Sequence, residues 1–143
     1  MLYFAYGSNM NHEQMKVRCP GASFLRRAYL DDFKFVYDGY SHMRNGAVAN
    51  IIQAKGSRVW GGLFEINKAN LSALDQYEGH PNSYNRAERD VNDDNDIRYK
   101  AIVYCRAGKD LGKPLEEYRK IIIQGARDCD VSEEYIQSSL GPT

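Results

Sequence analysis

LYFAYGSNM, residues 2–10, is the stretch that says most about how this chain folds. Its apolar and aromatic first half predicts a short buried strand, and Gly7 breaks that strand. Small polar residues follow, and residues 11–19 then have the pattern of a helix. A strand–glycine–helix junction presents backbone N–H groups at the positive end of the helix. We therefore expect an anion, such as a phosphate or a carboxylate, to bind there.

Length, charge and cysteine content exclude several classes of protein. With 143 residues the chain can form one core, and we expect a single domain over residues 1–143. Its 19 basic and 19 acidic residues balance without long runs of either sign, which argues against nucleic acid or a membrane surface as partner. No apolar run approaches about 18 residues, and no signal peptide is visible. Three widely spaced cysteines indicate free thiols and a cytoplasmic location.

Turn signals divide the middle of the chain into segments rich in aromatic and β-branched residues, which predict strands. In chain order these strands cover residues 24–37, Ala47–Gln53, Val59–Ile66, Tyr84–Val91 and Arg98–Cys105. The expected connections are Asp38-Gly39 with the loop Tyr40–Gly46, a turn at Gly56-Ser57, and a polar hairpin turn over residues 92–96. The segment Val59–Ile66 is almost wholly apolar, as is typical of a strand buried on both faces.

Helical spacing of apolar residues marks most of the remaining chain. Asn67 is a plausible N-cap for a helix that carries Leu71, Leu74 and Glu78 on one face and ends at Gly79. Pro114 can start a helix that runs to about Cys129, and a short helix over Ser132–Leu140 follows. Because strands and helices do not alternate regularly, the sequence predicts a mostly antiparallel α+β domain or a small barrel.

The carboxylate of Glu78 is the first candidate for chemistry, because it continues an apolar helix face. Burial and the negative end of the helix both raise the pKa of such a carboxyl group, as a general base working near neutral pH requires. The spacing equally allows a rim residue whose carboxylate reaches solvent past Gly79. Tyr118, on the apolar face of the 114–129 helix, is either a packing residue or a hydroxyl at a pocket wall.

Other site patterns find little support. A thiol nucleophile needs a histidine partner in space, and none of the three histidines has a suggestive context. The isolated cysteines argue against a metal site, and the opening loop lacks the Gly-Lys-Ser/Thr ending of a P-loop. Arg18 and the pair Arg26-Arg27 fit solvated or anion-steering positions better than a nucleic-acid face.

Together these segments resemble the γ-glutamylcyclotransferase family, which is also called AIG2-like. The opening Tyr3–Asn9 is similar to the N-terminal signature of that family. Further similar segments follow in the same order: Asp32–Phe35, Val59–Gly61, Asn67–Leu71, Leu74-Asp75 through Glu78-Gly79, and Tyr118–Ile122 with Gly125-Ala126. The resemblance covers about residues 2–128. The opening motif and the Leu-Asp-x-x-Glu-Gly element are each moderately specific, and their joint occurrence is a strong signal.

The resemblance implies a fold, a reaction and a set of residues. The fold is α+β, a small mixed and mostly antiparallel β-barrel with flanking helices. The reaction converts a γ-glutamyl amide to 5-oxoproline and a free amine, with no cofactor and no metal. Carried over residue by residue, the catalytic residue is Glu78, and the substrate-binding residues are Tyr3, Phe4, Ala5, Tyr6, Gly7, Ser8, Asn9 and Tyr118.

These residue types suit that reaction. The substrate's own α-amino group attacks the γ-carbonyl, and a carboxylate can accept its proton and then deliver it to the departing nitrogen. Orienting the substrate for ring closure can contribute about 7–11 kcal/mol to the acceleration. Loop N–H groups would hold the substrate α-carboxylate or the developing oxyanion, Gly7 would permit close approach, and Ser8 and Asn9 could add hydrogen bonds.

Two alternatives stay open for the function. The loop Tyr40–Gly46 is shorter than in the animal enzyme, so the same chemistry could remove a γ-glutamyl group from a larger biosynthetic intermediate or a γ-glutamylamine. In a different class, the domain could bind a small molecule without catalysis. The apolar segment 59–66 and the many tyrosines would also permit a homodimer.

Overall fold

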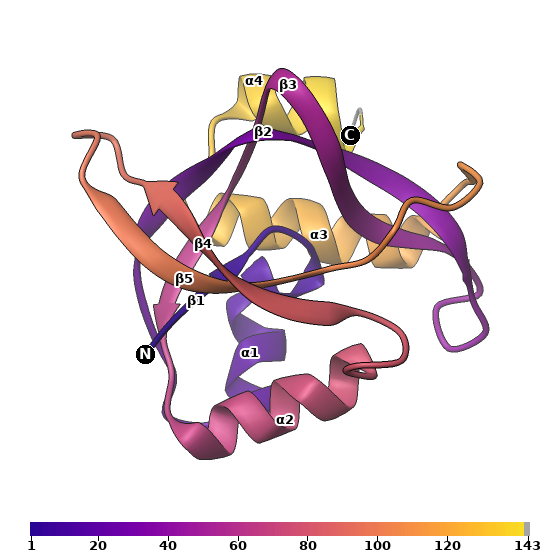
Figure 1. Ribbon diagram of the computed structural model, residues 1–143. Coiled ribbons are helices and arrows are strands. Elements are labelled where there is room, and N and C mark those ends of the chain that lie inside the picture. Colours follow the sequence, from indigo (N-terminus) through magenta and orange to yellow (C-terminus); the bar gives the residue numbers. More distant parts are fainter. Residues whose placement is uncertain (142–143) are drawn as a thin grey trace.

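The computed structural model describes residues 1–141 as a β-barrel flanked by helices (Figure 1). The strands are β1 (Leu2–Ala5), β2 (Ser23–Ser41), β3 (Gly46–Glu65), β4 (Asn85–Asn92) and β5 (Arg98–Cys105). The helices are the 3₁₀-helix η1 (Ser8–Met10), α1 (His12–Arg18), α2 (Lys68–Glu78), α3 (Glu116–Asp128), α4 (Glu133–Tyr135) and the π-helical η2 (Ile136–Leu140). Residues 142 and 143 of the expected domain lie outside the described residues.

The five strands close in the order β1-β3-β2-β4-β5. Strand β1 pairs antiparallel with β3 and parallel with β5, where Tyr3 is in register with Ile102. The β2–β3, β2–β4 and β4–β5 pairs are antiparallel. The predicted mixed and mostly antiparallel barrel with flanking helices is therefore confirmed.

Two predicted strand ends are wrong, because β2 and β3 form one long hairpin instead of several short strands. The expected turn at Gly56-Ser57 is a bulge: the register shifts between the pairs Asp31–Arg58 and Phe33–Gln53. The N–H of Gly56 donates to Oδ1 of Asp32 at 3.0 Å, and both residues have positive φ. A second register shift lies between Asp38 and Ser41, so Asp38-Gly39 does not end the strand either. A bulge bends a strand without ending its pairing. In the sequence, the residues that form a bulge cannot be told apart from those that form a turn.

The helices begin and end within about two residues of the predicted positions. Asn11 caps α1, and Asn67 forms a capping box with Asn70 at the start of α2. Gly79 ends α2 in the left-handed conformation, with φ 67°. The predicted helix over Ser132–Leu140 is present as two short segments, α4 and η2. None of the helices within residues 1–141 has the length and apolar character needed to cross a membrane.

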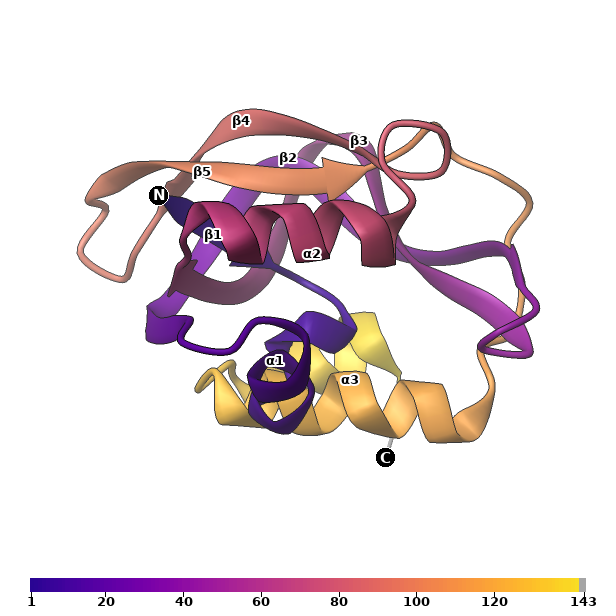
Figure 2. The ribbon, with the colours of Figure 1, turned by 90° about the horizontal axis from the view of Figure 1, so that it is seen from below.

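Helix α3 packs directly against η1, and this contact positions the loop after β1 (Figures 1 and 2). A Cβ atom on Gly125 would lie 2.4 Å from the backbone nitrogen of Asn11, so a larger residue would push the two helices apart. The core is continuous from the barrel interior to these helices, and it includes Phe4, Leu63 and Ile122, which are fully buried.

Candidate active site

A cavity of about 330 Å³ opens between the loop after β1, the end of α2, the β2–β3 hairpin tip and the segment after β5. This volume suits a small-molecule ligand. Of the residues predicted for the site, the ones that line the cavity are Tyr3, Phe4, Tyr6, Gly7, Ser8, Asn9, Glu78 and Tyr118. Ala5 is fully buried and does not line it. The role of Ala5 in substrate binding, which the resemblance implied, stays a prediction.

Glu78 is the last residue of α2, and its side chain lines the cavity. Burial raises the pKa of its carboxyl group to about 7, although the positive charges of Arg18 and Arg44 act in the opposite direction. Within residues 1–141, no protein donor is hydrogen-bonded to this carboxylate. A carboxyl group with a pKa near 7 can both accept and release a proton near neutral pH.

The aspartate of the Leu74-Asp75 pair anchors the helix that carries Glu78. Oδ1 of Asp75 accepts hydrogen bonds from the hydroxyl of Tyr104, at 2.6 Å, and from Nε of Arg86, at 2.8 Å. Both donors belong to the strand pair β4–β5, so α2 is tied to the barrel wall. Leu74 is fully buried beside this anchor. These contacts fix the direction of the last turn of α2.

Polar side chains hold the segment from Tyr3 to Asn9, which comprises the end of β1 and the loop after it. Nδ2 of Asn9 donates to the Tyr3 hydroxyl at 3.0 Å, and Nε2 of Gln14 donates to Oγ of Ser8 at 2.8 Å and to Oδ1 of Asn9 at 2.9 Å. The backbone N–H groups of Gly7, Ser8 and Asn9 have no acceptor within the described part of the chain. Consecutive free N–H groups at a cavity wall form an anion-binding surface.

The N-terminus of α1 is not the anion site that the sequence predicted. Oδ1 of Asn11 accepts the N–H of Gln14 at 3.1 Å, and Oδ2 of Asp128 accepts the N–H of His12 at 3.0 Å. Protein groups therefore occupy this helix end. The 3₁₀-helix η1 separates it from the strand, which the sequence pattern did not reveal.

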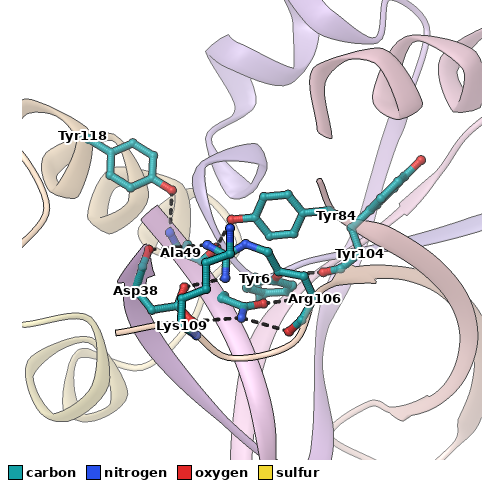
Figure 3. Close-up of polar contacts among 9 residues, drawn as sticks. Tyr6, Asp38, Ala49, Tyr84, Tyr104, Arg106, Lys109 and Tyr118 are labelled. Carbon is teal, nitrogen blue, oxygen red and sulfur yellow. Dashed lines mark hydrogen bonds and ion pairs between the residues drawn. The ribbon is translucent and has the colours of Figure 1, made fainter. Parts of the chain in front are cut away.

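Two tyrosines complete the wall at Ala49 of β3 (Figure 3). The Ala49 N–H donates to the Tyr118 hydroxyl at 2.9 Å, and the Tyr84 hydroxyl donates to the Ala49 carbonyl at 2.5 Å. Burial raises the pKa of Tyr118 to about 12, so its hydroxyl stays protonated at neutral pH. Because this hydroxyl accepts the Ala49 hydrogen bond, its own proton remains available for a ligand.

Arginine side chains surround the cavity, and sequence reasoning missed most of them. Arg18 donates to Oδ1 of Asn9 at 3.1 Å, and Arg44 donates to Oε1 of Gln14 at 3.1 Å and stacks on the Tyr118 ring. Arg106 is paired instead with the buried Asp38 at 2.8 Å (Figure 3). Arg44, Arg106, Gln14 and Tyr84 come from separate segments, and no local motif marks them.

A thiol–histidine pair lies apart from the cavity. Sγ of Cys129 is 3.7 Å from Nε2 of His12 and 3.3 Å from the carbonyl oxygen of Met10. Burial raises the pKa of this thiol far above its usual range. The thiol is therefore a packing group rather than a nucleophile.

Comparison with known proteins identifies the family. The sequence model of the family described as γ-glutamyl cyclotransferase, AIG2-like, matches residues 3–122. The chain belongs to this family. Among its members, the mouse γ-glutamylcyclotransferase is 34% identical to this chain over 139 residues, which cover 94% of this chain and 74% of the mouse protein. The human γ-glutamylcyclotransferase gives the same identity and coverage.

The fold comparison agrees with the sequence comparison. A solved structure of a γ-glutamyl cyclotransferase superposes on this family member with a TM-score of 0.90 and 32% identity. The superposition covers 99% of this chain and 88% of that chain. The crystal structure of YkqA from Bacillus subtilis shares the fold, with a TM-score of 0.81 over 96% of this chain and 51% of that chain, at 24% identity.

Proposed function

We propose that this protein is a γ-glutamylcyclotransferase that releases 5-oxoproline and a free amine from a γ-glutamyl amide, with Glu78 as general base and then general acid. Three observations together support the assignment of Glu78. Its carboxyl group has a pKa of about 7, has no protein hydrogen-bond donor within residues 1–141, and shares the cavity with the loop Gly7–Asn9. Family membership and the named relatives support the reaction class.

The mechanism begins with the ammonium form of the substrate's α-amino group. Glu78 accepts a proton from it, and the free amine attacks the γ-carbonyl carbon to form a five-membered ring and a tetrahedral oxyanion. Glu78 then delivers a proton to the amide nitrogen as the carbon–nitrogen bond breaks and the oxyanion re-forms the carbonyl. After ring closure the ring nitrogen still carries one extra proton. Glu78, ionised again once it has protonated the leaving nitrogen, accepts this second proton, and the departing amine takes it up to become an ammonium ion. The two protons lost by the α-nitrogen are therefore the two gained by the departing nitrogen.

The remaining residues of the site bind and orient the substrate. The N–H groups of Gly7, Ser8 and Asn9 support binding of the substrate α-carboxylate or the developing oxyanion, because donors aimed at that charge stabilise it in a dry cavity. The Ser8 and Asn9 side chains bond to Gln14 and Tyr3, so we assign them to holding the loop. The free O–H of Tyr118 would donate to the substrate. Tyr3, Phe4 and Tyr6 shape the apolar wall.

The test is a panel of γ-glutamyl substrates graded by the size of the amine, with 5-oxoproline measured directly. We expect release from at least one member. If turnover rises with amine size, the substrate is a larger biosynthetic intermediate. The mouth of the cavity supports that alternative, since Tyr40 and Met43 line it and are exposed. Binding of γ-glutamyl compounds without turnover of any would instead show a non-catalytic binding module.

We propose one domain over residues 1–143. A cytoplasmic location is supported by the free thiols of Cys19, Cys105 and Cys129. A homodimer stays a prediction, and sedimentation of the purified protein would test it.

A further inference from the structure

Gln14, in the first turn of α1, connects two walls of the cavity, although it is not one of the described residues that line the cavity. Its Nε2 donates to Oγ of Ser8 at 2.8 Å and to Oδ1 of Asn9 at 2.9 Å. Its Oε1 accepts a hydrogen bond from the guanidinium group of Arg44 at 3.1 Å. An amide nitrogen has two N–H groups, so both donors are used on the loop after β1. The same amide therefore joins that loop to the tip of the β2–β3 hairpin.

These partners also determine which way the Gln14 amide points. The reversed amide would turn N–H groups toward the N–H groups of Arg44, and its oxygen toward the oxygen of Asn9, so both contacts would become repulsive. The backbone of Gln14 is fixed as well, because its N–H donates to Oδ1 of Asn11 at 3.1 Å. Nδ2 of Asn11 in turn donates to the carbonyl oxygen of Ile121 in α3 at 3.3 Å. Gln14 is thus supported by two helices, and one orientation of its amide satisfies all of its partners.

The guanidinium group of Arg44 depends on this contact for its position. Arg44 lies in the hairpin tip, residues 42–45, where its backbone N–H donates to Oγ of Ser41 at 3.2 Å. That bond stays within the hairpin and leaves the side chain free to rotate. The guanidinium group is held by Gln14 of α1 and by the ring of Tyr118, whose centre is 4.9 Å from the guanidinium carbon. Because a held arginine loses rotamer freedom, we expect the side chain to leave this position when the Gln14 amide is removed.

The position of Arg44 matters because its charge acts on Glu78. The charges of Arg18 and Arg44 lower the pKa of the Glu78 carboxyl group, against the larger effect of burial. The other ionisable groups that interact with this carboxylate are four tyrosines, and burial raises the pKa of each, so they are uncharged near neutral pH: Tyr3, Tyr6, Tyr84 and Tyr118. Loss of Arg44 from the cavity would therefore leave Arg18 as the cation opposing the effect of burial.

We infer that Gln14 is a positioning residue for the proposed reaction, because its amide fixes the loop Gly7–Asn9 and Arg44 relative to each other around the cavity that contains Glu78. Its effect on turnover rests on the proposed function. Through Ser8 and Asn9, Gln14 holds the backbone N–H groups that we assign to the substrate. Through Arg44, it keeps a positive charge near the general base. Both effects are indirect, since Gln14 itself contacts neither the substrate nor the reacting atoms.

The first test is a pH titration of the substrate-free protein, in which NMR follows the carboxyl carbon of Glu78. Methionine has nearly the length and helix propensity of glutamine but no amide. We expect Gln14→Met to raise the pKa of Glu78 by at least about 0.5 alone, and by less than about 0.2 when Arg44→Met is also present. Two controls at exposed residues should leave the pKa unchanged: Gln124→Met in α3 and Arg98→Gln at the start of β5. No rise in Gln14→Met, or equal rises with and without Arg44→Met, would overturn the inference.

The second test measures kcat and KM for 5-oxoproline release at a pH above the titration of Glu78, where the base is ionised in every variant. A displaced loop misorients the bound substrate, so we expect Gln14→Met to lower kcat at least about tenfold and to change KM less than about threefold. Gln14→Glu keeps the shape of the side chain but has no donor for Ser8 and Asn9, so its kcat should fall similarly. Unchanged kcat in both folded variants, or an equal loss in Gln124→Met, would overturn the inference.

The two tests separate this inference from the proposed function. If the wild type releases no 5-oxoproline from any substrate, the proposed function fails. The titration of Glu78 still decides whether Gln14 positions Arg44, because that measurement needs no substrate. An active wild type in which Gln14→Met leaves the titration of Glu78 unchanged would overturn the inference and leave the proposed function standing.

Discussion

At the scale of single residues, the protonation of Glu78 depends on its burial and on two arginines that are far from it in the sequence. Burial raises the pKa of the carboxyl group to about 7, and the charges of Arg18 and Arg44 limit that rise. The sequence predicted the direction, because Glu78 continues the apolar helix face of Leu74. It could not predict the opposing arginines, because Arg18 comes from α1 and Arg44 from a hairpin tip.

The pH dependence of turnover should report this pKa. The base must be ionised to accept the proton of the substrate ammonium, so kcat/KM should rise with pH through about 7. Removing the positive charge of Arg18 removes an effect that lowers the pKa, so in Arg18→Gln the rise should move to higher pH. Arg98→Gln should leave the profile unchanged. A rise near the ordinary glutamate value of about 4.3 in wild type would contradict this account of Glu78.

At the scale of elements, the sequence predicted features that depend on one segment alone. It did not predict features that depend on contacts between segments. The caps at Asn67 and Gly79 follow from local backbone geometry, so the sequence predicted α2 well. The bulge at Asp32 and Gly56 depends on how β2 and β3 pair, so a local pattern could not separate it from a turn. The occupied N-terminus of α1 likewise depends on Asp128, which lies at the far end of the sequence.

The contact between α3 and η1 gives a prediction for Gly125. A glycine-to-alanine change inside a helix normally stabilises the helix by up to about 1 kcal/mol. Here the added Cβ would lie 2.4 Å from the Asn11 nitrogen, so we expect Gly125→Ala to lower the free energy of unfolding by about 1–3 kcal/mol. Chemical denaturation measures this change. Lys120→Ala, on the exposed face of α3, should stay within about 0.5 kcal/mol of wild type, and a stabilised Gly125→Ala would disprove the close contact.

At the scale of the whole molecule, the barrel brings residues that are distant in the sequence together around one cavity. The loop after β1, the end of α2, the hairpin tip and α3 each contribute one wall of the cavity. The resemblance to a family predicted the loop, Glu78 and Tyr118, because those residues lie in recognisable motifs. It did not predict Arg44 or Tyr84, because only the closed barrel brings them to the same cavity. It did not predict Gln14 either, which holds Ser8, Asn9 and Arg44 by hydrogen bonds.

The buried ion pair between Asp38 and Arg106 joins β2 to the segment after β5. The side chains of the two residues are 1% and 9% exposed, and Asp38 also accepts the N–H of Lys109 at 2.9 Å. Asp38→Asn leaves the Arg106 charge buried without a partner, so we expect a loss of about 3–5 kcal/mol in the free energy of unfolding. Asp90→Asn, which removes an exposed pair with Lys100, should cost less than about 1 kcal/mol. Equal losses would refute a structural role for the buried pair.

The central claim is that the carboxyl group of Glu78 transfers the proton during ring closure. The most direct measurement is kcat/KM for 5-oxoproline release by Glu78→Gln, on the best wild-type substrate, with folding checked by circular dichroism and thermal melting. Glutamine keeps the shape of the side chain but cannot accept the proton. The account predicts a folded variant with a loss of at least about 100-fold, as is typical when a general acid–base group is removed. A folded Glu78→Gln variant with wild-type turnover would contradict it.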